Sequence, residues 1–136
     1  MFESVLPAWL RYLLAGLASL TSYLWGAKDQ WIMALIVFVI TDYITGVMAA
    51  SVNGKLSSAE GFKGLFRKVA IFVIVAVANV LDSTMQVNGV IRSVVIGFFC
   101  ANEGLSILEN CSKMGLPVPQ KLIDALEQLR KENESK

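Results

Sequence analysis

A single acidic residue inside a long apolar stretch constrains this chain more than any other feature. The stretch runs from Trp31 to Ala50 and reads WIMALIVFVITDYITGVMAA, with Asp42 as its one charged side chain. About twenty apolar residues are what a helix needs to cross a hydrocarbon core of roughly 30 Å. An acid at that depth costs at least about 2.5 kcal/mol and rarely faces lipid. The stretch therefore predicts a membrane span that turns Asp42 inward.

The side of this helix that carries Asp42 is suited to contact with another helix. The residues that share it at helical spacing are small or polar, namely Thr45, Gly46, Ala49 and Asn53. Most of the other positions are Ile, Val, Leu or Phe, which suit lipid. Small residues let helix backbones approach closely in a membrane.

The composition agrees with a small membrane protein. The chain has 136 residues, of which 55% are hydrophobic, and it has no histidine. It is too short for two soluble domains and too apolar for one ordinary soluble domain. The formal net charge of +1 does not indicate a nucleic-acid partner.

The apolar segments predict an all-α, polytopic fold with about four transmembrane helices. These spans are expected at about 5–26, 31–51, 69–86 and 90–110, within a membrane domain of residues 1–115. Residues 116–136 are expected to form a short amphipathic cytoplasmic helix and tail. The first span requires Arg11 to reach an interface. The alternative is an amphipathic helix that lies on the membrane surface, which leaves three spans and an external N-terminus.

Positive charge indicates the topology. Basic side chains concentrate in the predicted loop after the second span, at Lys55, Lys63, Arg67 and Lys68. By the positive-inside rule this loop is cytoplasmic, and four spans then place both termini in the cytoplasm. Arg92 and Asp82 are candidates for an ion pair across the outer turn.

The last span combines an acid with small residues. Glu103 is expected at a depth similar to that of Asp42. The small residues predicted to make helix contacts are Gly46, Gly97 and Gly104, with Ala101 four residues after Gly97 in a small-xxx-small pair.

Several motifs occur together between residues 31 and 126. They are TDYITGVMAA from Thr41, GKLSS and GLFRK around Lys55 to Lys68, and NEGLSILEN from Asn102 followed by GLPVP. With these motifs the chain resembles the toxin-secretion and phage-lysis holin family.

The resemblance implies accumulation in the bacterial cytoplasmic membrane and timed formation of lesions that release a muralytic enzyme (endolysin) or a toxin. The expected partners are further copies of the chain, in a homo-oligomer, and the lipid bilayer. The residues predicted as pore or intramembrane polar groups are Asp42, Asn79, Asn102, Glu103 and Glu109, and the polar faces that bear Asp42, Asn102 and Glu103 are expected to form the wall of the lesion.

Two other functions fit the same features. A small proton-coupled exporter would use a membrane carboxylate that alternates between a proton and a cationic substrate. That reading expects a single acid in an aromatic pocket, whereas here acids occur in three spans. An antiholin would share all the signals of a holin. No motif indicates catalysis, a metal site or a cofactor, so we expect no enzymatic activity.

Overall fold

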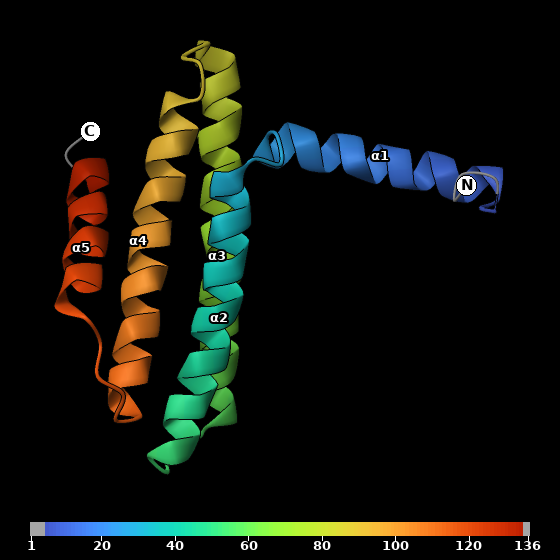
Figure 1. Cartoon of the computed structure of the whole chain (residues 1–136). Helices are drawn as coiled ribbons and strands as arrows, with labels where there is room; N and C mark the ends of the chain where they lie inside the picture. The colour runs from blue at the N-terminus through green and yellow to red at the C-terminus, as the bar shows by residue number, and fades with distance from the viewer. Residues whose placement is uncertain (1–4, 135–136) are drawn as a thin grey trace.

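The computed structural model describes residues 5–134, and every regular element in that range is a helix (Figure 1). The five helices are α1 (Ala8–Trp25), α2 (Gln30–Val52), α3 (Ser58–Met85), α4 (Val90–Lys113) and α5 (Gln120–Glu134). The predicted all-α class is therefore confirmed.

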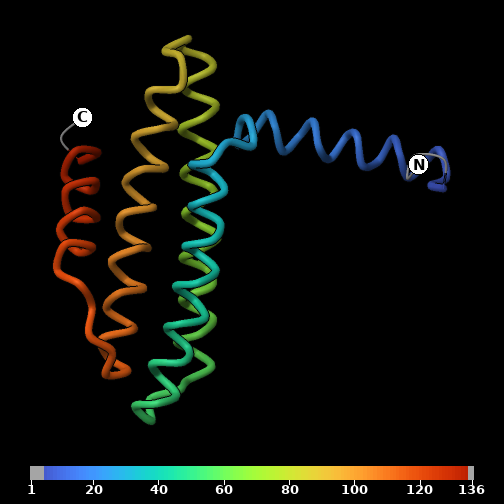
Figure 2. Tube along the Cα trace, in the orientation of Figure 1, coloured from blue at the N-terminus to red at the C-terminus, as the bar shows by residue number. Residues whose placement is uncertain are grey.

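Helices α2, α3 and α4 form an elongated bundle, and their backbones run side by side in Figures 1 and 2. They contain 23, 28 and 24 residues, and all three are long and apolar enough to cross a membrane. The largest fully buried side chains between them are Leu35, Val75 and Ile96, one from each helix. The bundle thus has one apolar core, to which each of the three helices contributes side chains.

Three candidate spans take the place of the four that the sequence predicted. Helix α1 has 18 residues, none of them buried, and it projects crosswise from the bundle (Figure 1). Arg11 and several hydroxyl and aromatic residues interrupt its apolar run, so it does not qualify as a span by length and composition. A count of four transmembrane helices is not supported.

The basic segment after α2 is mostly helical, which corrects the predicted loop. Helix α3 begins at Ser58, so the turn that follows α2 covers only residues 53–57. Good helix formers such as Ala59, Lys63 and Leu65 outnumber the glycines of this segment. Glu60 also lies in the first turn, where it complements the helix dipole. This extension brings Lys68 into the bundle.

Helix α5 folds back along α4 after the turn at Gly115 and the two prolines (Figure 1). A Cβ atom built on Gly104 would lie 3.0 Å from Leu126 of α5, and one on Gly97 would lie 2.7 Å from Asn133. The two helices are therefore in close contact at both glycines.

With three spans, the two ends of the helix bundle are predicted to lie on opposite sides of the membrane. We expect an epitope tag at the N-terminus to be accessible from outside intact cells, and one in the turn at residues 53–57 to be protected until the membrane is opened. Labelling with an antibody before and after permeabilisation measures this. An N-terminal tag that is protected in intact cells would contradict the three-span arrangement.

Candidate functional site

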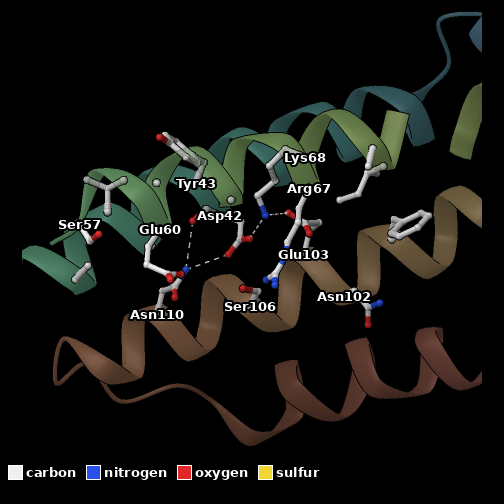
Figure 3. Close-up of a pocket in the computed structure, with 18 of the residues that line it drawn as sticks. Asp42, Tyr43, Ser57, Glu60, Arg67, Lys68, Asn102, Glu103, Ser106 and Asn110 are labelled. Atoms are coloured by element: carbon white, nitrogen blue, oxygen red, sulfur yellow. Dashed lines mark hydrogen bonds and ion pairs between the residues drawn. The ribbon is translucent and has the colours of Figure 1, made fainter. Parts of the chain in front are cut away.

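A buried ion cluster joins the three candidate spans, α2, α3 and α4. The ammonium of Lys68 on α3 is paired with the Asp42 carboxylate on α2, and it lies 2.5 Å from Oε2 of Glu103 on α4. Figure 3 shows the three side chains turned toward one another between the helices. The cluster therefore contains one basic and two acidic groups, each from a different span.

Asn110 of α4 completes the environment of Asp42. Its side-chain amide donates to Oδ1 of Asp42 and to the Thr45 hydroxyl, each at 3.0 Å. Gly46 faces this amide, and a Cβ atom there would lie 3.6 Å from the Asn110 nitrogen, an ordinary van der Waals distance. Asp42 is thus held by an ammonium and by an amide, which satisfies an acid within a bundle.

The cluster lies deep in the apolar part of the bundle. The side chains of Lys68, Asp42 and Glu103 are 13%, 9% and 10% exposed. Asp42 is about 18 Å from the start of α2, and Glu103 about 20 Å from the start of α4, at 1.5 Å per residue. Charged groups at such a position must satisfy one another, because lipid offers no compensation.

A cavity of about 590 Å³ adjoins the cluster on the side of the α2–α3 turn. Besides the cluster its lining includes Tyr43, Gly64, Arg67, Phe99, Asn102 and Ser106. Within residues 5–134 no group of three His, Cys, Asp or Glu side chains could hold a metal ion.

A second polar cluster lies at the opposite end of the bundle, around Arg92. Its guanidinium donates to the backbone oxygens of Trp25 and Ala27 at 2.8 and 3.0 Å, and to Oδ2 of Asp29 at 2.7 Å. The hydrogen bond from Arg92 holds the pKa of Asp29 below its ordinary value of 3.8. Arg92 therefore ties the α1–α2 turn to α4.

Asp82 does not pair with the side chain of Arg92, which corrects the pairing considered from the sequence. Its carboxylate accepts the backbone N–H groups of Gly89 and Arg92, at 2.6 and 2.8 Å. These are unpaired donors at the start of α4, where a negative charge is favoured. Asp29 offers a bidentate partner to Arg92 instead.

Asn79 belongs to this outer cluster and not to the one around Lys68. It is buried, and its amide donates to the backbone oxygen of Tyr23 at 2.8 Å. The indole of Trp25 donates to the Phe72 oxygen at 2.9 Å. These two bonds fix the end of α1 on α3.

The other residues singled out from the sequence are spread over the molecule. Glu109 is exposed and pairs with Lys113 at 3.0 Å. Asn102 lines the cavity but lies apart from the ion cluster (Figure 3). The small residues Gly97, Ala101 and Gly104 are buried on α4, and the two glycines face α5. Lys55, Lys63 and Arg67 are exposed.

Lys68 and Asn110 are the site residues that the sequence analysis missed. Lys68 was assigned to topology alone, as part of a basic loop. A spacing signal was present, because Ile71 and Val75 follow Lys68 at three and seven positions and are both buried. Extending that face by one turn places Lys68 inside the bundle.

The chain has sequence relatives that match it over most of its length. The chain is 40% identical over 113 residues to an uncharacterized protein of Listeria monocytogenes, covering 83% of this chain and 81% of that protein. It is 37% identical over 123 residues to an uncharacterized Clostridium perfringens protein, covering 89% and 92%. A Bacillus phage phi105 protein named probable holin is 36% identical over 115 residues, covering 85% and 84%.

No solved structure matches the chain. Residues 19–131, by contrast, match a family described as the bacteriophage holin family. This match covers most of the chain, including the three spans and both polar clusters, and it confirms the resemblance seen in the motifs. The chain belongs to the bacteriophage holin family.

Proposed function

We propose that copies of this protein associate laterally in the bacterial cytoplasmic membrane and form lesions through which an endolysin or a toxin leaves the cell. Membership of the holin family and the relative named probable holin support this role. No chemical step is required of the protein, so we infer that it is not an enzyme.

The observation that carries the proposal is the Lys68 cluster. Both of its acidic groups pair with Lys68 inside one protomer, while the outer faces of α2 and α3 present apolar residues such as Ile40, Ile44 and Val73. A single protomer is therefore compatible with lipid and can accumulate in the membrane before any lesion exists. Polar groups that are hidden in such a bundle can meet water once enough copies assemble.

Co-expression with a cytoplasmic endolysin that lacks an export signal tests the proposal. We expect the turbidity of the culture to fall abruptly after a delay. Asp42→Asn should shift the delay, because an amide still accepts a hydrogen bond from Lys68. Asp42→Leu should impair lysis more strongly, because it leaves Lys68 and Asn110 with fewer partners.

The outcome also separates this function from proton-coupled export. An exporter would pass no endolysin, the culture would stay turbid, and Asp42→Asn would abolish transport. Absence of lysis despite membrane insertion, shown by fractionation, would count against the release of an endolysin.

A further inference from the structure

Helix α1 is left uncovered by the rest of the protomer. It has 18 residues, which extend about 27 Å at 1.5 Å per residue, and none of them is buried. It projects crosswise from the side of the bundle in both Figure 1 and Figure 2. Its apolar side chains therefore need a partner outside the protomer.

The level at which α1 joins the bundle is that of a membrane surface. The amide of Asn79 donates to the backbone oxygen of Tyr23, so the end of α1 lies where α3 changes from apolar to polar. Beyond Asn79 the outer part of α3 carries Asp82 and Ser83. Trp31, at the start of α2, is half-exposed at the same end of the bundle. Tryptophan at the end of an apolar helix is typical of the boundary between lipid and water.

Polar contacts hold α1 in its crosswise position. The guanidinium of Arg92 on α4 donates to the backbone oxygens of Trp25 and Ala27. The indole of Trp25 donates to the Phe72 oxygen on α3 at 2.9 Å. When α3 and α4 cross the membrane, a helix fixed across them in this way runs along the membrane surface.

The two sides of α1 differ as an interfacial helix requires. The leucine side, as we call it, consists of four residues at helical spacing, namely Leu13, Leu17, Leu20 and Leu24. The opposite side carries Arg11 and Ser22, and the exposed Tyr12 and Tyr23 lie between the two sides. An apolar side with aromatic groups at its border matches the order of acyl chains, headgroups and water.

Charge indicates what kind of lipid surface α1 fits. Arg11 is the one charged residue of α1, and the helix has no acid. Attraction to anionic headgroups is therefore small, and the affinity must come from the apolar area that is buried. The chemistry suits the lipid–water interface as such and not one particular headgroup.

We propose that α1 lies in the outer lipid–water interface, with its leucine side among the acyl chains and the side of Ser22 toward water. This inference goes beyond the proposed holin function and needs only that α2, α3 and α4 cross a membrane. An arm of this kind fixes the depth and the tilt of the bundle. Displacement along the membrane normal would draw leucines into water or push polar groups into lipid.

Labelling with a charged, membrane-impermeant maleimide tests the placement. It uses single cysteines in a protein whose Cys100 and Cys111 are replaced by Ala and Ser. The positions are Leu13, Leu17 and Leu20 on the leucine side, and Ala15, Ser19 and Ser22 on the opposite side. In right-side-out vesicles the leucine side should react at least about tenfold more slowly than the opposite side. Because α1 has no buried residue, these changes leave the bundle folded.

Each other pattern has a distinct meaning. Fast labelling of all six positions would mean that α1 is free in water, and protection of all six would mean that it crosses the membrane. Disulfide-linked dimers of Leu17→Cys in oxidised membranes would mean that a second copy covers the leucine side. Any of these results would overturn the inference.

A matched pair of variants tests the role of the leucine side. Leu17→Asp places a charge among the acyl chains, so the labelling of Leu20→Cys should accelerate about tenfold. Ala15→Asp places the same charge in water and should leave that rate unchanged. Equal rates in the two variants would contradict the proposed orientation of α1.

The composition of the vesicles tests the source of the affinity. The ratio of labelling rates between the two sides should be the same in phosphatidylcholine vesicles with and without phosphatidylglycerol, at low and at high salt. Protection that requires phosphatidylglycerol would overturn the inference, because it would show an anionic-lipid site. Lysis with a co-expressed endolysin is scored separately, so its absence together with alternating labelling would refute the proposed function and leave the placement of α1 intact.

Discussion

Replacing Lys68 by methionine is expected to destabilise the folded bundle by about 3–5 kcal/mol, the usual cost of removing one partner from a buried ion pair. The change leaves the carboxylates of Asp42 and Glu103 without the ammonium that lies between them. Asn110 still donates to Asp42, whereas Glu103 loses the ammonium that donates to it. The variant should accumulate poorly in the membrane and should not lyse cells.

Thermal unfolding in detergent and the amount of protein in isolated membranes measure this effect. Lys63→Met is the matched control, because Lys63 is exposed on the same helix. A rescue is expected when Lys68→Met is combined with Asp42→Asn and Glu103→Gln, because the remaining groups are then neutral. Equal stability of the Lys68 and Lys63 variants would refute a structural role for the cluster.

Replacing Arg92 by glutamine is expected to release the α1–α2 turn from the bundle. The change removes donors to Trp25, Ala27 and Asp29, and hydrogen bonds to charged groups contribute about 1.5–3 kcal/mol each. Arg92→Lys should restore only part of the loss, because one ammonium cannot reproduce the planar fork of a guanidinium. A protease added to the outside of right-side-out vesicles should cleave residues 26–29 much faster in the glutamine variant than in the wild type.

The ion pair between Arg92 and Asp29 also makes the attachment of the α1–α2 turn depend on pH. Because Arg92 lowers the pKa of Asp29 in the folded protein, the stabilisation is complete above the ordinary value of 3.8. It is lost as the pH falls through the lowered value. Cleavage of the wild-type turn should therefore accelerate in strongly acidic medium, using an acid-active protease, while Asp29→Asn should show no such step. An identical acceleration in Asp29→Asn would contradict this role of Asp29.

Hydropathy and periodicity were sufficient to predict the helical class and the three long apolar helices of the bundle. The predicted span at 5–26 is not supported, and the helix found there, Ala8–Trp25, has no buried residue. Its apolar face resembles that of a spanning helix, and length and periodicity do not separate a span from an interfacial helix when a charge such as Arg11 lies near one end.

The candidate site was predicted only in part, for a physical reason. Asp42 and Glu103 were identified because an acid within an apolar run has a high free-energy cost in a membrane, whichever residues begin and end the helix. Lys68 was missed because a basic residue next to a span has two roles, as a topology signal and as a buried counter-ion. The choice between them depends on where α3 begins, and helix boundaries are the feature that local sequence determines least well.

The two polar clusters have a mechanical consequence for each protomer. One fixes α2, α3 and α4 to each other near mid-span, and the other fixes α4 to the α1–α2 turn at the far end. Sliding α2 past α4 by a single turn, about 5.4 Å, would disturb the ion pairs at both levels at once. The two clusters thus fix the axial position of α2 relative to α4 at two separate levels. In the proposed assembly, this link favours rotation and tilt of helices over sliding of α2 along α4.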